Sequence, residues 1–283
     1  MTSFATLKFW NSAAGRFRKA SPLSRPRRAL ALVALALAPL ALPAPARAEE
    51  KPEPPTSLVL TYRIEPRNRA AFRSWLETRG ARQFEAWKKT GTLKDYRILF
   101  SSYVPDSASD DVTLIVDFAR FEDTAAWTKI ERTMPGGLPP EALALATPQA
   151  GVLTDVLVRS ENPSVDHAKA VFTIVKYGAP SADRYVQYVT DYYVPEYGRL
   201  RELGVLAGYS VYLNQNHSHA TWDAIIVSEF PDLAAYQASD QAKDDAREEL
   251  LKNPAWKKAA EAKAGIRRTL SSTNAEAILA PAP

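Results

Sequence analysis

Apolar and polar positions recur along this 283-residue chain after an interval of 113 residues. The offset aligns residues 58–64 (LVLTYRI) with residues 171–177 (VFTIVKY), and both runs have the composition of β-strands. It also aligns two helical faces with i, i+3, i+4, i+7 spacing. The aligned pairs are Phe72 with Tyr185, Trp75 with Tyr188, Leu76 with Val189, and Arg79 with Tyr192. The chain is therefore predicted to hold one α/β unit twice.

The same offset predicts a second strand in each half. Residues 91–96 and 204–209 both read Gly-x-Leu-x-x-Tyr and follow the predicted helix directly. After a hairpin loop that is four residues shorter in the second half, the offset becomes 109. A last strand is expected to begin near Gly151 in the first half and near Gly265 in the second.

The 109-residue offset aligns a passage from strand to helix. It places Phe121 on Phe230 and Asp123 on Asp232, and each aspartate is predicted to cap the N-terminus of the following helix. Each half is thus predicted to be β-α-β-β-α-β, the ferredoxin-like order. Because helices cover only one face of such a sheet, the open faces of two units can stack into a barrel.

The predicted fold class is α+β, with two tandem ferredoxin-like repeats that form an intramolecular α/β-barrel. The repeats are expected to span residues 57–160 and 169–279, with a linker over residues 161–168. Such a chain contains its own pseudo-dimer, so a monomer is compatible with the barrel.

Positive charge gathers before residue 49. The first 48 residues hold eight Lys and Arg and no acid, and they include the apolar run 29–42. The run is followed by Ala46-Arg47-Ala48, which supplies small residues at the −3 and −1 positions. This pattern predicts a signal peptide cleaved after Ala48 and a periplasmic or secreted protein, by the Sec or the twin-arginine route. The run is shorter than the roughly 20 residues that a membrane anchor needs.

The charge that remains after cleavage argues against nucleic acid as a partner. The mature chain keeps 28 of the 36 basic residues against all 32 acidic ones, a net charge near −4. No basic cluster remains to bind a phosphate backbone, and no membrane association is expected after cleavage. Residues 49–56 and 280–283 are expected to form a Pro-rich leader and a tail. The absence of Cys excludes disulfides and thiolate zinc sites.

The repeat order resembles the dimeric α/β-barrel superfamily, with its dimer fused into one chain. Residues 204–209 (GVLAGY), 225–236 (IIVSEFPDLAAY) and 251–256 (LKNPAW) are similar to the NIPSNAP-type branch, next to the antibiotic-biosynthesis-monooxygenase-like proteins. The first half departs from this pattern at residues 134–140 (MPGGLPP), where a long helix would run. The superfamily also includes cyclases and haem enzymes, so the resemblance implies a fold and no single chemistry.

Two aligned cations are the first candidate ligand-binding residues. Arg63 and Lys176 lie on one face of the two first strands, and as a pair inside a barrel they would suit a carboxylate or phenolate. The alternative is that both reach solvent from strand ends. Trp222 is expected to line the same cavity.

A tyrosine-rich helix is the second candidate. Residues 182–194 carry four Tyr, of which Tyr188 and Tyr192 are predicted to line an aromatic pocket, with Pro195 kinking or ending the helix. The alternative is that these rings only pack on the sheet.

Histidines and acids supply the candidate catalytic groups. His217 and His219 lie on a predicted loop before Asp223, where a metal site would lack a third ligand of known geometry, so none is predicted. His167 lies in the linker without an aligned partner. The sequence lacks the Walker, dinucleotide, GxSxG and HExxH motifs, and no cofactor is expected. A haem would need an axial ligand, and neither His217 nor His219 lies on a predicted helix.

Three functions follow from these features. The first is binding of a small apolar or aromatic, anionic ligand. The second, implied by the resemblance, is a cofactor-independent monooxygenase, cyclase or lyase in the same cavity. In it Tyr209, His217 or Asp223 would act as proton donor or base on an aromatic or polyketide-like substrate. The third is a non-catalytic protein-interaction module.

Overall fold

The first half of the barrel is built from four strands, with helices after the first and after the third. The computed structural model describes residues 55–104, 106, 109–216 and 222–281, which lie in one compact unit, Lys51–Pro283. The elements of the first half are β1 Thr56–Ile64, α1 Arg69–Trp75, α2 Ala81–Lys89, β2 Asp95–Ser101, β3 Val112–Asp117, α3 Thr124–Glu131, α4 Pro140–Leu143 and β4 Ala146–Ser160.

The second half repeats this order with a longer last helical region. Its elements are β5 Val171–Gly178, α5 Ala182–Tyr188, α6 Val194–Glu202, β6 Gly208–Asn214, β7 Ala224–Phe230, α7 Leu233–Leu250, α8 Pro254–Ile266 and β8 Arg268–Ile278. Both helices after the first strand and the strand that follows them begin 113 residues after their counterparts, as the sequence predicts. The turns before β2 and β6 also match, because Gly91 and Gly204 both have φ near +70°.

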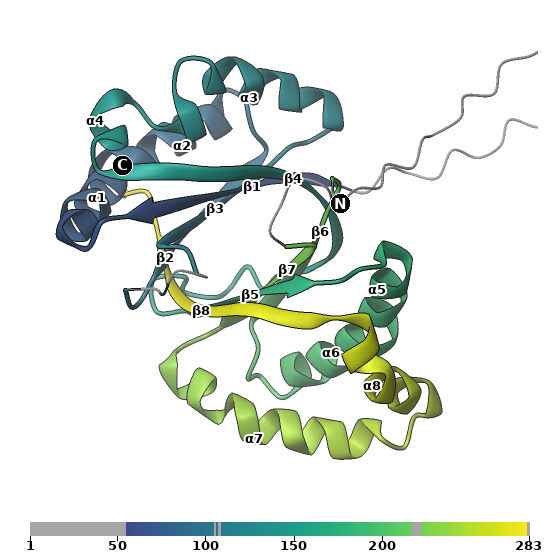
Figure 1. Ribbon diagram of the computed structural model, residues 1–283. Helices are drawn as coiled ribbons and strands as arrows, with labels where there is room; N and C mark the ends of the chain where they lie inside the picture. The colour runs from purple at the N-terminus through teal and green to yellow at the C-terminus, as the bar shows by residue number, and fades with distance from the viewer. Residues whose placement is uncertain (1–54, 105, 107–108, 217–221, 282–283) are drawn as a thin grey trace, which may run out of the picture. The chain divides into compact units, whose positions relative to one another are not determined.

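Eight antiparallel strands close into one barrel, which confirms the predicted intramolecular arrangement (Figure 1). Their order is β1-β3-β2-β8-β5-β7-β6-β4, so the halves join where β2 pairs with β8 and where β4 pairs with β6. Since neighbours are antiparallel, β1, β2, β5 and β6 run in one direction. We call the end where these four strands finish the Lys176 end, and the end where they start the Glu229 end.

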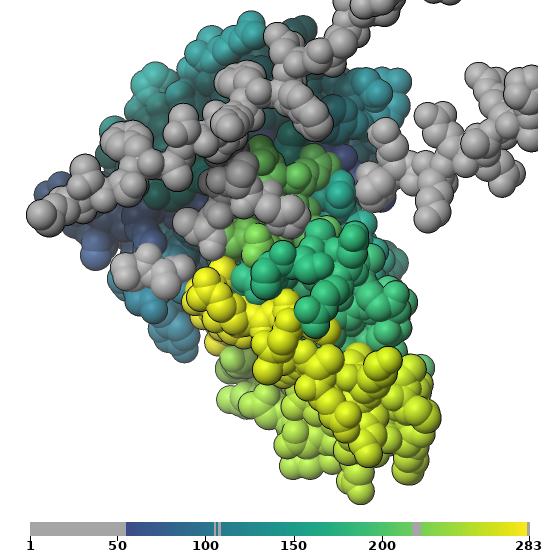
Figure 2. Space-filling model, turned by 45° about the vertical axis from the view of Figure 1, so that its right-hand side comes forward, coloured from purple at the N-terminus to yellow at the C-terminus, as the bar shows by residue number. Residues whose placement is uncertain are grey.

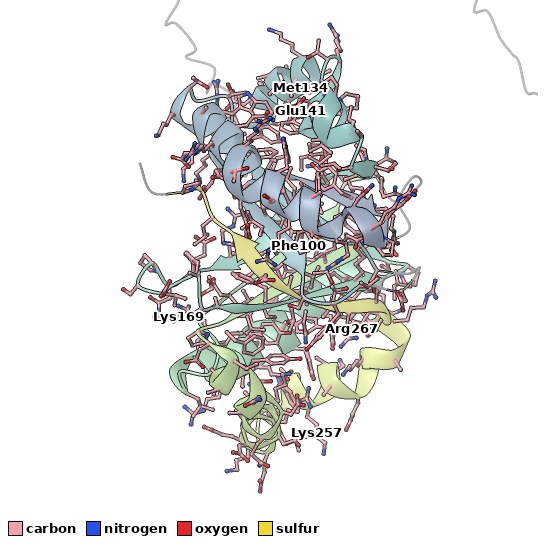
Figure 3. The ribbon with its side chains drawn as sticks, turned by 90° about the vertical axis from the view of Figure 1, so that its left-hand side faces the viewer. Phe100, Met134, Glu141, Lys169, Lys257 and Arg267 are labelled. Atoms are coloured by element: carbon pink, nitrogen blue, oxygen red, sulfur yellow. The ribbon has the colours of Figure 1, made fainter. Side chains whose placement is uncertain are left out.

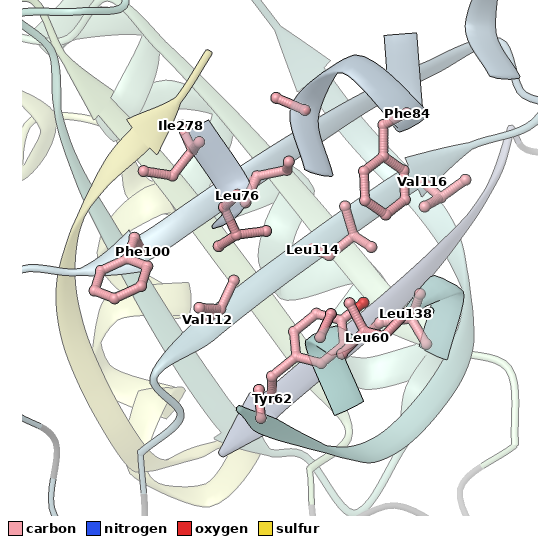
Figure 4. Close-up of a cluster of buried hydrophobic side chains, with 14 of the residues drawn as sticks. Leu60, Tyr62, Leu76, Phe84, Phe100, Val112, Leu114, Val116, Leu138 and Ile278 are labelled. Atoms are coloured by element: carbon pink, nitrogen blue, oxygen red, sulfur yellow. The ribbon is translucent and has the colours of Figure 1, made fainter. Parts of the chain in front are cut away.

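The strands β1, β3, β6 and β7 are buried on both faces. Eight of the nine residues of β1 are buried, and Arg63 is the exception. Alternate side chains of a strand point into the barrel and towards the helices, so both sets are covered. An inner cluster that includes Val59, Ile115 and Phe172 fills the barrel. Two outer clusters pack under the helices, and the first-half cluster is built from aliphatic and aromatic side chains such as Leu60, Leu76 and Phe84 (Figure 4).

Each first helical region contains a π-helical turn. The turns Leu76–Gly80 and Val189–Tyr193 interrupt otherwise continuous helices at equivalent positions. A π turn holds one residue more than an α turn, so the side chains after it are rotated about the axis. Of the two predicted effects of Pro195, kinking or ending the helix, the structure excludes the second. Pro195 occupies the first turn of α6, where its missing N–H removes no α-helical hydrogen bond, and the helix continues to Glu202.

The alignment of Phe121 with Phe230 is wrong. Phe230 ends β7 and is 2% exposed, whereas Phe121 lies four residues beyond the end of β3 and is 48% exposed. The Asp232 carboxylate accepts a hydrogen bond from Ala235 N at 2.8 Å and caps α7 as predicted. The Asp123 carboxylate instead bonds back to Arg120 N across a short 3₁₀ turn. The 109-residue offset therefore places the starts of α3 and α7 correctly, with Asp123 and Asp232 directly before them, but it does not align the ends of the preceding strands.

The last strands begin near the predicted residues, with offsets. β4 starts at Ala146, five residues before Gly151, and β8 starts at Arg268, three residues after Gly265. Within the described ranges, no helix is long and apolar enough to cross a bilayer.

Candidate functional site

The predicted site residues fall into two separate layers of the fold. Arg63, Lys176 and Trp222 belong to the barrel at its Lys176 end, and Trp222 is part of the inner cluster. Tyr188, Tyr192 and Tyr209 belong to the outer cluster between the second half of the sheet and its helices. The structure therefore does not bring these six residues into one cavity.

Both predicted cations meet the loop between β2 and β3. Lys176, 8% exposed, forms an ion pair with Asp110. The Arg63 guanidinium donates to the backbone carbonyl of Asp106 at 2.9 Å. The aligned cations thus hold this loop at the Lys176 end of the barrel, and as ligand-binding residues they stay predictions.

Two of the three predicted catalytic residues have structural contacts. The Asp223 carboxylate accepts from Ala179 N at 2.6 Å and joins the end of β5 to the start of β7. The ring of Tyr209 packs edge-on against Tyr197 at 5.0 Å and is 6% exposed. His217, like His219, lies outside the described residues.

The outer layer of the second half contains a cavity of about 360 Å³. We call it the tyrosine pocket and define it by Tyr177, Tyr192, Tyr193, Tyr197 and Arg267, which all line it. Its floor is the outer face of β5, β7 and β8, and its walls are the π turn, α6, α7 and α8. In the space-filling view, α7 and α8 form the green to yellow lower end of the molecule (Figure 2).

Capped helices hold the walls of the tyrosine pocket. The Asn253 side chain accepts from Ala255 N and Trp256 N and starts α8. Trp256 then stacks on Tyr192 at 5.0 Å and donates from Nε1 to the Tyr192 carbonyl at 3.1 Å. Tyr192 stacks in turn on Tyr188 at 4.9 Å. The aromatic rings are therefore fixed before any ligand arrives.

Arg267 carries positive charge into the pocket from the junction of α8 and β8 (Figure 3). Its guanidinium carbon lies 4.3 Å from the ring centre of Tyr177 and 5.5 Å from that of Tyr193. It donates a long hydrogen bond of 3.3 Å to Thr269 Oγ1, it also interacts with the Tyr188 phenol, and Nε has no partner among the described residues. Aromatic faces stabilise this cation, but most of its donors stay available.

The pocket has more cationic side chains than acidic side chains to pair with them. Glu196 is 1% exposed and pairs with Arg247 at 3.0 Å, so these two charges compensate each other. Lys263 and Arg267 form no ion pair within the described ranges. Burial, with the nearby charges of Arg267 and Arg247, lowers the pKa of Lys263. The pocket therefore favours an anion.

Buried phenol groups in this layer lack hydrogen-bond partners. The hydroxyls of Tyr185 and Tyr193 are buried and unpartnered within the described residues, and the rings are 0% and 3% exposed. Burial raises the pKa of both phenols far above the ordinary value, so both remain protonated donors. Burial also raises the pKa of Tyr192 to about 12.

The aligned helix positions of the first half carry no hydroxyls. The 113-residue offset pairs four helical phenols of the second half with residues of the first half that have no hydroxyl. These pairs are Tyr185 with Phe72, Tyr188 with Trp75, Tyr193 with Gly80, and Tyr197 with Phe84. A Cβ on Gly80 would lie 2.8 Å from the Trp75 ring, so indole fills the corresponding space. The sequence contains this difference between the halves, but of these four tyrosines only Tyr188 was predicted to line a pocket.

His167 has a partner that the sequence pattern did not predict. Its Nδ1 lies 2.5 Å from Glu229 Oε1, although 62 residues separate them in the chain. The pairing joins the linker to β7, and hydrophobic periodicity alone does not predict such a contact.

Metal and haem ligands are few in the described part of the chain. No group of three or more His, Cys, Asp or Glu there could hold a metal ion. The lining of the tyrosine pocket contains no imidazole, thiolate or thioether, so it does not fit a haem with those axial ligands.

Comparison with known proteins identifies the fold. The chain matches no family of known sequences and no curated protein. An anthrone oxidase-like protein of known structure is similar with a TM-score of 0.53 at 12% identity, over 82% of this chain and 98% of that chain. A monooxygenase candidate from Lactobacillus acidophilus NCFM gives a TM-score of 0.49 at 13% identity, over 80% and 95%.

The first of these likenesses covers both halves of the barrel. Its low identity shows the fold alone, and the likeness to the NIPSNAP-type branch stays a prediction. The chain has the dimeric α/β-barrel fold, with both halves of the barrel in one polypeptide.

Proposed function

We propose that this protein binds a small aromatic molecule with an anionic group in the tyrosine pocket. The observation that carries the proposal is the replacement of phenyl and indole by phenol at equivalent positions of the two halves. Phe and Trp occupy three of these helix positions in the first half, and the two phenols of that layer, Tyr62 and Tyr96, donate to the carbonyls of Gly136 and Ala81. Packing alone therefore does not explain the hydroxyls of the second half.

Unmet hydrogen bonds support a ligand in this place. A buried hydroxyl without a partner costs about 1 to 3 kcal/mol. Tyr185 and Tyr193 bear this cost in the free protein. A ligand with acceptor oxygens would satisfy the Tyr193 hydroxyl at the pocket wall, and its ring would contact the edge of Tyr192, whose faces are stacked on Tyr188 and Trp256.

The charge of the pocket selects the ligand class. Arg267 offers free donors, and Lys263 stands near it without an acidic partner in the described ranges. Guanidinium binds carboxylate through two parallel hydrogen bonds. An aromatic carboxylate or phenolate would meet both requirements, and a volume of about 360 Å³ lies within the range of small-molecule sites.

A thermal-shift screen tests the proposal. Aromatic acids are compared with their primary amides, which keep the ring and lose the charge. At one hundred times its Kd a ligand adds about 2.7 kcal/mol of stability. For a protein of this size that raises Tm by roughly 5 to 10 °C. We expect acids to stabilise the wild type and Arg267→Gln to lose the effect.

The screen has a control and a contrary outcome. Arg79→Gln removes an exposed cation from the first half, at the position that aligns with Tyr192, and should leave the shifts unchanged. If amides stabilise the protein as well as acids do, or if Arg267→Gln keeps the full shift, the ligand is not held as proposed. An absence of ligands of either kind would favour the interaction-module alternative.

A cofactor-independent enzyme in the same pocket is the second candidate. The observation in its favour is the lowered pKa of Lys263, because a lysine that loses its proton more easily can act as a general base. The named likeness to an anthrone oxidase-like protein suggests anthrone as a probe. Oxygen uptake with anthrone that disappears in Lys263→Gln would support the enzyme, and wild-type uptake no faster than the buffer rate would exclude this reaction.

We also propose that the chain is exported. The basic, apolar and small-residue segments before Glu49 support a signal peptide. Mass spectrometry of protein recovered from the periplasm of a bacterial host should find Glu49 at its N-terminus. Protein that stays in the cytoplasm with residues 1–48 attached would contradict export.

A further inference from the structure

The Glu229 end of the barrel carries a second hollow, separate from the tyrosine pocket. A cavity of about 560 Å³ lies between the start of β2, the end of β8 and the linker that joins the two halves. Its lining includes Arg97, Glu161, His167 and Phe172. In the side view, Lys169 of the linker and Arg267 of the tyrosine pocket lie at opposite edges of the barrel (Figure 3).

A histidine and a carboxylate are paired at this hollow. The Glu229 side chain is 4% exposed and the His167 side chain 43% exposed. An ionised carboxylate can only accept, so Nδ1 of His167 donates to Oε1 of Glu229 and Nε2 stays unprotonated in the neutral ring. Nε2 has no hydrogen-bond partner among the described residues. This is the geometry of an oriented base.

The neighbouring strand holds Glu229 in position. Gly208 on β6 lies opposite Glu229, and a Cβ at Gly208 would come within 2.8 Å of the Ser160 carbonyl and 3.4 Å of Glu229 Oε2. The clash with Ser160 requires a glycine at this position, and the carboxylate lies beside it at contact distance. The dyad is therefore built on barrel strands, although His167 itself comes from the linker.

Arg97 provides an anion-binding group in the same hollow. Its guanidinium donates to Glu161 at 3.1 Å, and the Glu161 side chain is 48% exposed. It also lies over the ring of Phe172 at 6.0 Å. One hydrogen bond uses one of five donors, so Arg97 can take a carboxylate without losing an internal ion pair.

The neighbouring Arg159 differs from Arg97. It binds both oxygens of Asp117 at 2.6 and 2.7 Å, and Ser57 donates to the same carboxylate at 2.5 Å. Arg159 is therefore committed to the barrel wall. Arg97 therefore has more donors to spare than Arg159.

We propose that this hollow is a second site, in which Arg97 binds the carboxylate of a small organic acid and His167 moves a proton at Nε2. Glu229 is a positioning residue that fixes the ring and stabilises its protonated form. The substrate class is a small carboxylic acid with a second polar group that gains or loses a proton. Arg97 and His167 were not among the predicted site residues.

Ester hydrolysis provides a defined probe of proton transfer. With His167 as base, Nε2 takes a proton from water while the water oxygen bonds to the ester carbonyl carbon. The ester C–O bond then breaks, 4-nitrophenolate leaves with the electron pair, and a carboxylic acid forms. The probes are the mono-4-nitrophenyl ester of glutaric acid, which keeps a free carboxylate, and neutral 4-nitrophenyl acetate.

Substitutions of the three residues are expected to have different effects on kcat and KM. His167→Gln should lower kcat for both esters more than tenfold, since general-base catalysis contributes about 10² to 10⁴. Arg97→Gln should raise KM for the glutarate ester and leave the acetate ester unchanged. Glu229→Gln should lower kcat for both esters and leave KM for the glutarate ester unchanged, because the substitution alters only how the His167 ring is held. Arg79→Gln is the matched control.

Two results would overturn the proposal. One is a wild-type rate within twofold of His167→Gln for both esters, and the other is an unchanged KM for the glutarate ester in Arg97→Gln. His167→Asn keeps a donor for Glu229 and serves as the variant if His167→Gln does not fold, as judged by circular dichroism. A failed aromatic-acid screen would leave these measurements unaffected, because the two sites share no residue.

Discussion

At the scale of single residues, Tyr193 is the side chain whose hydroxyl is least explained by packing and best explained by ligand binding. It is 3% exposed and its hydroxyl has no partner in the described ranges. Its counterpart in the first half is Gly80, which makes room for the indole of Trp75. A hydroxyl in this position lowers stability unless something binds to it.

Tyr193→Phe should therefore stabilise the free protein. Removing an unsatisfied buried hydroxyl adds about 1 kcal/mol or more to the free energy of unfolding, because the ring stays in place. The same change should weaken binding of an aromatic acid by roughly five- to tenfold, the worth of one hydrogen bond of about 1 kcal/mol. Urea unfolding and titration calorimetry measure the two effects. A destabilised Tyr193→Phe protein would show that the hydroxyl has a structural partner.

Lys263 makes ligand binding depend on pH. Its pKa in the folded protein lies below the ordinary 10.5, because burial and the charges of Arg267 and Arg247 disfavour its protonated form. The protonated form attracts an anion, so affinity for an aromatic acid should fall as pH rises through this lowered pKa. Titration calorimetry between pH 7 and 10.5 should show the fall in the wild type. Lys263→Gln should bind more weakly at pH 7 and lose the pH dependence.

The lowered pKa of Lys263 also determines how its contribution to the free energy of unfolding changes with pH. Since folding lowers the pKa of Lys263, the folded state binds fewer protons than the unfolded state near that pH. The Lys263 contribution is therefore unfavourable below the folded pKa and disappears as pH rises through both values. A bound anion opposes this effect.

At the scale of elements, the two π turns are the feature that the sequence did not predict. The periodicity of apolar residues predicts both helices, and the structure confirms them with the predicted 113-residue offset. A π turn adds one residue without changing the composition, so hydrophobic spacing does not reveal it. In the second half it sets the direction of Tyr192 and Tyr193, and π turns are common at functional sites.

Deleting one residue from a π turn should restore an α turn. Deletion of Asp191 rotates the following part of α6 by about 100° relative to α5 and should lower affinity for an aromatic acid more than tenfold. Deletion of Thr78, at the equivalent position of the first half, should leave that affinity within about twofold, provided that the core repacks. Calorimetry of both variants, with circular dichroism as the check on folding, decides this. Equal losses in both would mean that the π turns serve the fold alone.

At the scale of the whole molecule, the barrel order follows from the repeats. Each half leaves one face of its sheet open, and the closed order with β2 on β8 and β4 on β6 covers both open faces. The sequence could predict this because the repeat recurs at nearly constant spacing. It could not predict the contacts of loops, such as Asp110 with Lys176 or His167 with Glu229, since those depend on how distant segments meet.

Separate halves should not fold by themselves. Without its partner each half exposes the inner cluster and two unpaired strand edges. Residues 55–160 and 169–281 expressed apart should lack cooperative unfolding, whereas mixing them should restore the thermal transition of the intact chain. A half that unfolds cooperatively alone, with the Tm of the intact protein, would contradict the shared barrel.

The most direct test of the central claim is a crystal structure with the aromatic acid that stabilises the protein best. The account predicts electron density in the tyrosine pocket, with the ring against Tyr192 and the acid group within hydrogen-bond distance of Arg267 and the Tyr193 hydroxyl. Density inside the barrel beside Lys176, or in the helical layer of the first half, would contradict it.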